Sequence, residues 1–132
     1  MNRKIIFRAK RSENNDWVYG DLLHPSCVSA GYEIHPYIRD RHACAHEVDK
    51  DTIGQSTGLY DKNGKEIYEG DIVLHKTYHG EKSCVVRFEC GAFIIGYHEG
   101  SSTKRTPMLI NKSCVLIGNI HDNPELIKEE QQ

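Results

Sequence analysis

The sequence predicts a mostly β fold, with an N-terminal hairpin lobe, a small barrel or bent antiparallel sheet, and a short C-terminal helix. Most apolar segments are short and flanked by turn residues, which favours strands over helices. The 11 glycines are scattered between these segments rather than gathered in one tract. With no internal repeat or low-complexity tract, we expect about eight short strands in one small domain.

The chain length fits one compact domain with two lobes. The chain has 132 residues, and domain cores usually need about 100–150 residues. We place the N-terminal β lobe at residues 1–51 and the barrel lobe, with its terminal helix, at residues 52–126. The chain has 17 basic and 19 acidic residues, so its net charge is −2. This nearly neutral charge argues against a general nucleic-acid binder.

The first lobe begins with an alternating segment. Ile5, Phe7 and Ala9 occupy alternate positions, and the positions between and after them are Ile6, Arg8 and Lys10. This alternation predicts a strand over residues 4–10. The polar cluster 11–16 predicts a turn, and 17–23 predicts a second strand that completes a hairpin. Residues 24–51 contain no clear element, except that 32–35 could resume a strand.

The second lobe opens with a predicted hairpin. Segments 59–60 and 66–68 flank Asn63-Gly64, a pair that favours two successive positive φ values in a tight turn. Glu69-Gly70 allows another bend before a strand at 71–74.

The rest of the second lobe predicts strands at 84–89, 92–97 and 114–120, the first two joined by Cys90-Gly91. From Tyr68 to Ile120 the five strands resemble a small SH3-like barrel. Asn123 as N-cap and Pro124 at the first helical position then predict a helix of at most about two turns.

Three segments carry a resemblance to a known family. They are Ile6-Phe7-Arg8-Ala9, the long block from Thr52 to Val73, and the segment from Ile117 to Leu126. Together they resemble the YopX family of small phage and prophage proteins. The resemblance covers nearly the whole chain and implies a mostly β fold. It implies no reaction, substrate or catalytic residue.

The residues of the long block have a structural interpretation and a functional one. Glycines permit positive φ, and Asp caps turns, so most of these positions are suited to specifying the fold. The alternative is a recognition surface. Its candidate binding residues are Gly54, Gln55, Thr57, Gly58, Asp61, Asn63, Gly64, Tyr68, Gly70 and Asp71.

The cysteines and the N-terminal sequence indicate a reducing compartment. Five cysteines are an odd number for a disulfide framework, and Cys84, Cys90 and Cys114 are expected to be small core residues. Arg8 and Lys10 interrupt the apolar start, so it lacks the uncharged core of about 7–15 residues that a signal peptide needs. Nor does any uncharged apolar run reach the roughly 18–20 residues of a membrane span. We expect a protein of the bacterial cytoplasm without membrane partners.

The segment His42-Ala43-Cys44-Ala45-His46 is the most suggestive local pattern. On a strand, His42, Cys44 and His46 would share one face and could begin a zinc site. A fourth ligand is missing; nearby candidates are His24, Cys27 and His35. The alternative is a polar loop that contains His and Cys without a metal, because the spacing matches no common zinc motif.

Three other chemistries are weaker. A Cys–His nucleophile pair would need an orienting group and an oxyanion hole, which no motif supplies. A set of carboxylates could act in catalysis but also suits solvated turns: Asp49, Asp51, Asp61, Glu66, Glu69 and Asp71. A barrel face could bind nucleic acid through aromatic and basic side chains: Tyr78, His79, Lys82, Arg87 and Tyr97.

The sequence therefore favours a non-enzymatic protein that binds a host or phage protein and associates with itself. The expected partner surface is the long block together with loops at 76–82 and 98–107. Nucleic-acid binding and zinc binding are the alternatives.

Overall fold

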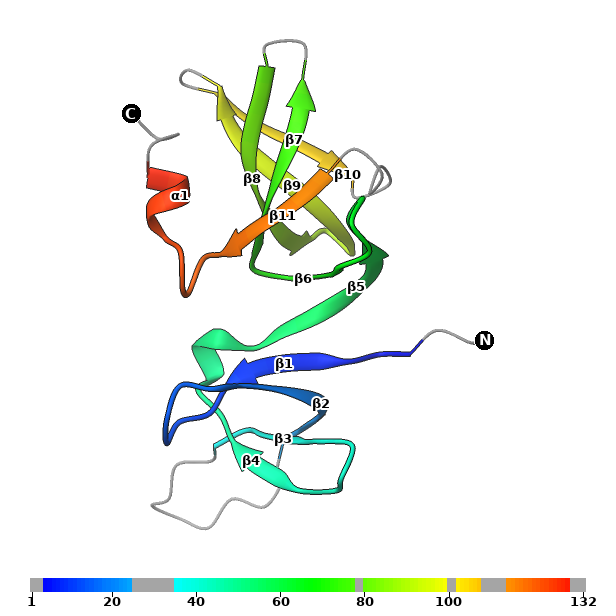
Figure 1. The fold of residues 1–132 in the computed structure, drawn as a ribbon, viewed down its shortest axis with the longest axis vertical. Coiled ribbons are helices and arrows are strands. Elements are labelled where there is room, and N and C mark those ends of the chain that lie inside the picture. Colours follow the sequence, from blue (N-terminus) through cyan, green and yellow to red (C-terminus); the bar gives the residue numbers. More distant parts are fainter. Residues whose placement is uncertain (1–3, 25–34, 78–79, 100–101, 108–113, 129–132) are drawn as a thin grey trace. The chain divides into compact units, whose positions relative to one another are not determined.

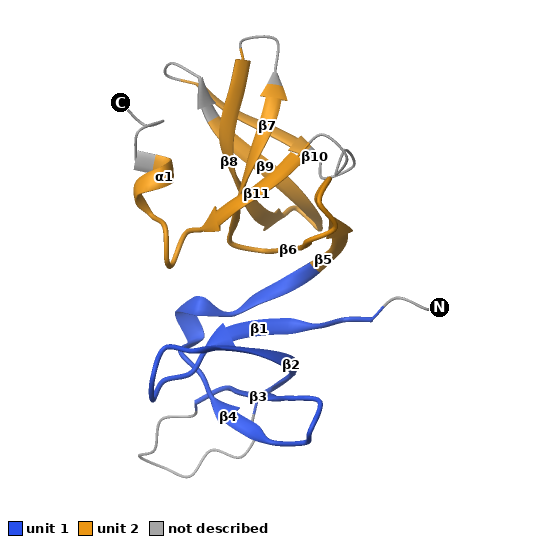
Figure 2. Cartoon of the chain, viewed as in Figure 1, with its two compact units in different colours: residues 1–56 blue, residues 57–132 orange. Residues whose placement is uncertain are grey.

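Short strands separated by turns form two antiparallel sheets (Figure 1). The structure is a computed structural model, and it describes residues 4–24, 35–77, 80–99, 102–107 and 114–128. The chain divides into two compact units, unit 1 at residues 1–56 and unit 2 at residues 57–132 (Figure 2). The boundary falls inside one strand, which continues from the first unit into the second.

Unit 1 is built on the predicted hairpin. Its β1 and β2 pair antiparallel, with Phe7 opposite Gly20 and Lys10 opposite Trp17. The hydrogen-bonded strand order is β4-β3-β2-β1-β5, and β6 of unit 2 follows β5. The elements are β1 (Phe7–Lys10), β2 (Trp17–Leu23), β3 (Tyr37–Arg39), β4 (Ala45–Glu47), the 3₁₀ helix η1 (Lys50–Thr52) and β5 (Gly54–Tyr60).

One face of this hairpin forms the core of unit 1. Ala9, Ile38 and Val48 are fully buried, and Val18 and Leu22 pack against them. Because side chains alternate across a strand, the other positions of β2, namely Trp17, Tyr19 and Asp21, point to the opposite face. The sheet therefore has one apolar core face and one face with mixed side chains.

Unit 2 is a curled five-stranded half-barrel with the order β10-β9-β8-β7-β11. Its buried core is Ile67, Val73, Cys84, Val86, Ile95 and Cys114. This confirms the predicted mostly β class with a bent antiparallel sheet and a short terminal helix. The elements are β6 (Glu66–Tyr68), β7 (Asp71–Thr77), β8 (Gly80–Glu89), β9 (Ala92–Glu99), β10 (Ser102–Pro107), β11 (Cys114–Asn119) and α1 (Glu125–Lys128).

Three strands were not predicted. β3 and β4 have three residues each, too few to show an alternating pattern. β10 has the polar sequence STKRTP and pairs with β9 on one side only. Since β9 reaches Glu99 and β10 covers 102–107, the predicted loop at 98–107 is wrong at all of its described residues. β7 and β8 likewise extend into the predicted loop at 76–82.

Three local expectations were also wrong. Cys90 is exposed, because it occupies the β8–β9 turn with φ of 52° rather than the core. In the turn between β5 and β6, Gly64 has a positive φ of 82°, but Asn63 does not have the positive φ that was expected. The side chain of Asn123 accepts a hydrogen bond from Asn119 N instead of capping α1.

The β5–β6 turn is organised by a buried carboxylate. Asp61 is 5% exposed. Its Oδ1 accepts hydrogen bonds from Asn63 N and Lys65 N, both at 2.9 Å. Its Oδ2 accepts one from Leu116 N at 2.9 Å, and Lys62 N donates to Cys114 O. The turn is thereby fastened to β11, an end strand of the five-stranded sheet.

The charge of Asp61 is stabilised despite its burial. Burial alone would raise the pKa of this carboxyl, but the N–H groups of Leu116, Lys65 and Asn63 lower it below its ordinary 3.8. Because the folded pKa is depressed, this stabilisation is present above about pH 4 and is lost as the pH falls through the folded pKa.

Replacing Asp61 by Asn should destabilise the protein at neutral pH. The amide NH₂ would replace an oxygen that accepts a bond, and a backbone N–H would lose its partner, which costs roughly 1–3 kcal/mol. Urea unfolding followed by circular dichroism measures this. The exposed Asp16→Asn is the matched control, with an expected change within about 0.5 kcal/mol. Equal stabilities of the two variants at pH 7 would contradict the role of Asp61.

Candidate functional site

The long block identified in the sequence is used mainly to build the fold. Gly54 and Gln55 open β5 and pair with Arg8 and Phe7 of β1. The hydroxyl of Thr57 donates to Ile67 O at 2.8 Å. Gly58 and Gly64 both have positive φ.

The end of the block makes a second turn. Asp71 is 1% exposed, and its Oδ2 accepts a hydrogen bond from Tyr68 N at 2.7 Å. Gly70, at φ 91°, donates through its N–H to Val86 O and accepts from Ile120 N. Asp61 and Asp71 are thus turn carboxylates within the fold, and Asp49 similarly caps η1 by accepting from Asp51 N. Binding through this block stays a prediction.

The His-x-Cys-x-His segment is not one strand. His42 lies in the turn that follows β3, Ala43 has φ of 63°, and β4 begins only at Ala45. The positive φ breaks the alternation that would have placed His42, Cys44 and His46 on one face. Cys44 Sγ instead lies 3.8 Å from His42 O.

His46 is held by a carboxylate. Its Nε2 lies 2.9 Å from Asp40 Oδ2, and Asp40 Oδ1 accepts from His42 N and Cys44 N. Of the further zinc candidates, His35 pairs with Glu47 at 3.4 Å and His24 is exposed, while Cys27 lies outside the described residues. Within the described ranges, no three His, Cys, Asp or Glu side chains gather as metal ligands. Zinc binding stays a prediction, tested by the metal content of the purified chain against His42→Ala.

Among the described residues of unit 2, one Cys–His pair lies within contact distance. Cys114 and His75 are opposite each other on β11 and β7, with Sγ 3.8 Å from Nδ1. The sulfur belongs to the buried core, where Cys114 is 1% exposed. A thiolate attack needs access to substrate, so this geometry suits packing.

Of the residues expected to bind nucleic acid, three are described: Arg87 and Tyr97 line the same cavity, and Lys82 does not line it. Tyr78 and His79 lie outside the described residues. Tyr97 packs against the core of unit 2, Lys82 is half-buried, and Arg87 is exposed. Arg87 lines a cavity of about 270 Å³ on β8, β9 and β10, where Arg105 pairs with Glu89 at 2.9 Å.

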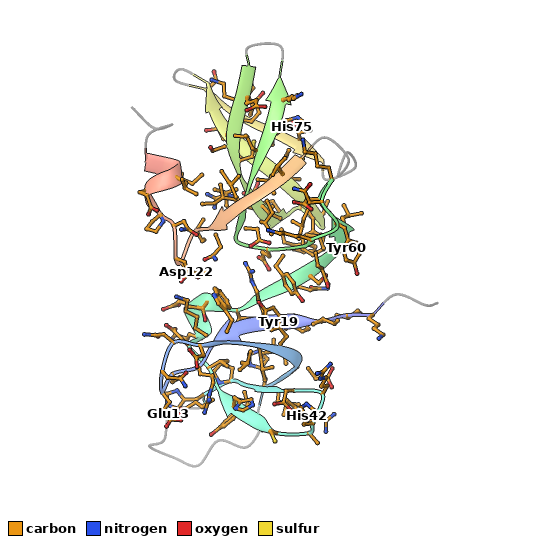
Figure 3. All side chains as sticks on the ribbon, in the orientation of Figure 1. Glu13, Tyr19, His42, Tyr60, His75 and Asp122 are labelled. Atoms are coloured by element: carbon orange, nitrogen blue, oxygen red, sulfur yellow. The ribbon has the colours of Figure 1, made fainter. Side chains whose placement is uncertain are left out.

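A larger groove lies in unit 1. Its volume is about 630 Å³, and it is more open to solvent than the cavity of unit 2. Figure 3 labels two of its residues, Tyr19 on β2 and His42 in the turn after β3. The lining comes from the segment before β1, from β2, and from the end of β3 with its turn: Lys4, Ile6, Trp17, Val18, Tyr19, Gly20, Asp21, Arg39, Asp40, Arg41 and His42.

Close packing of two strands shapes the groove. A Cβ at position 20 would collide with the carbonyl oxygen of Arg39, so β2 and β3 approach there only because residue 20 is Gly. Arg8 and Lys10 lie over the Trp17 ring, at 4.5 and 5.5 Å from its centroid. These cation–π contacts hold the indole against β1.

The groove combines an apolar lining with an unequal charge distribution. Ile6, Trp17 and Tyr19 contribute apolar surface, and Tyr19 is 47% exposed. The acids are already paired: Asp21 with Arg39 at 3.4 Å, and Asp40 with His46. Sequence reasoning missed this groove, because alternation predicts the two faces of β2 but not the neighbouring β3 turn.

The model of the YopX protein family matches residues 6–128. The chain belongs to the YopX family. Its fold is similar to the crystal structure of protein EF1440 from Enterococcus faecalis, with a TM-score of 0.55 and 24% sequence identity over 94% of this chain and 98% of that one. No curated protein matches the chain.

The helical content of this YopX-family chain is small. Within the described ranges, no helix is long and apolar enough to cross a membrane.

Asp40 should titrate far below an ordinary carboxyl. The hydrogen bond with His46, then the N–H groups of Cys44 and His42, lower its pKa from 3.8 to about 2. This stabilisation of the β3–β4 turn is complete above about pH 4 and is lost as the pH falls towards 2. An NMR titration of the carboxyl carbon measures the midpoint.

Two histidine variants separate the causes. His46→Ala should move the midpoint of Asp40 up towards 3.8, because the His46 bond is the largest cause of the shift. His42→Ala should leave it near 2, because only the backbone N–H of residue 42 is used. Equal midpoints in both variants would contradict the Asp40–His46 pairing.

Proposed function

We propose that this chain is a phage or prophage accessory protein of the bacterial cytoplasm, that it acts by binding another protein, and that it associates with itself. The observation that carries the proposal is the open groove of unit 1, with its apolar lining and exposed Tyr19. Aromatic residues and a desolvated centre typify protein-binding surfaces. No catalytic step is proposed.

The charges of the groove favour protein over nucleic acid. Asp21 and Asp40 line the same groove as its cations, so the groove is not the continuous basic surface that a phosphate backbone needs. Nucleic-acid binding is the second candidate, because Arg8 and Lys10 beside Trp17 resemble a basic and aromatic platform for single strands. Since these cations already lie over the ring of Trp17, a base could stack there only if they moved.

A photo-crosslinker at the groove tests the function. p-Benzoylphenylalanine replaces Tyr19, which is exposed and lines the groove, in the full chain expressed in bacteria. The matched control replaces Phe88 of unit 2, which is 51% exposed and outside the groove. We expect protein adducts at position 19, to another protein or to a second copy, and far fewer at position 88.

The adducts distinguish the candidates. Nuclease-sensitive adducts at position 19 would favour the nucleic-acid alternative over protein binding. Equal protein adducts at both positions would mean that the groove has no special role.

A further inference from the structure

We propose that the groove of unit 1 recognises a peptide segment of a partner protein in which an acidic residue neighbours a bulky apolar one. This inference rests on the proposed protein-binding function and names the chemistry of the partner. It comes from the balance of paired and unpaired charges around the apolar lining of the groove.

The acids of the groove are satisfied within the protein. Asp40 accepts two backbone N–H bonds and pairs with His46, and Asp21 pairs with Arg39. A partner's cation would therefore compete with contacts that already exist. The acids of the groove are therefore poorly suited to bind a basic segment.

Two cations that line the groove make no ion pair with another described residue. Lys4 precedes β1 and Arg41 lies in the turn after β3, and both are exposed. Because they come from different segments of the lining, a carboxylate in the groove can meet a cation without breaking an existing pair.

The apolar lining of the groove favours a partner with an apolar side chain beside that carboxylate. Ile6, Trp17 and Tyr19 form apolar surface there, and burying such surface favours binding. A nucleic-acid strand would bring many phosphates and few apolar groups. A segment with one acidic residue next to Leu, Ile or Phe meets both features of the groove.

The test is a selection from random heptapeptides displayed on phage, made with the full chain and with the double reversal Lys4→Glu/Arg41→Glu. Both sites are exposed, and circular dichroism checks that the variant folds. The wild-type chain should enrich peptides with Asp or Glu beside a bulky apolar residue. The reversed chain should lose that preference or prefer Lys and Arg.

The affinity is then measured with a built-in probe. Trp17 is the one tryptophan of the chain and lines the groove, so its fluorescence reports occupancy. The most enriched peptide should bind roughly tenfold more weakly to the reversed chain. The matched control reverses two exposed lysines of unit 2, Lys62→Glu/Lys104→Glu, and should bind as the wild type does.

Four results would overturn the proposal: no enriched peptide, enrichment without acidic residues, equal affinity of the reversed chain, or preferred binding of a dT20 oligonucleotide. Enrichment only of segments of this chain would instead identify the groove as an interface between copies. Protein adducts at position 19 together with any of these results would keep the protein-binding function and reject the acidic segment.

Discussion

The carboxylate of Asp61 fastens together parts of unit 2 that are far apart in the chain. Its bond to Leu116 N spans 55 residues, while its bonds to Asn63 N and Lys65 N close the turn beside it. A buried carboxylate is tolerated only when such donors compensate for lost hydration. The order of unit 2 at the β11 end of its sheet therefore depends on one acid in a turn.

The long block from Thr52 to Val73, which contains Asp61, shows why a recognisable sequence pattern need not mark a binding site. Gly58, Gly64 and Gly70 have positive φ. Asp71 accepts a hydrogen bond from Tyr68 N, and the hydroxyl of Thr57 donates to Ile67 O. Each is a backbone requirement of the fold. The groove that we propose as the binding surface is lined by Lys4, Tyr19 and Arg41, which are exposed and therefore less constrained by the fold.

The sequence predicted the parts of the fold that rest on local chemistry. The hairpin of β1 and β2, the strands with apolar runs and the short helix follow from alternation and turn residues. β3, β4 and β10 could not be predicted, since three-residue strands and the polar β10 owe their pairing to neighbouring strands. The groove escaped for the same reason: its lining comes from β2 and from the turn after β3, which pairing alone brings together.

The central claim is that the long block builds the fold and that the groove of unit 1 does the binding. Hydrogen–deuterium exchange of the full chain, with and without the most enriched peptide, tests it most directly. The account predicts slower exchange at residues 17–21 and 39–42 and no change at 61–71. Protection confined to the 61–71 segment would contradict the account and make the block the recognition surface.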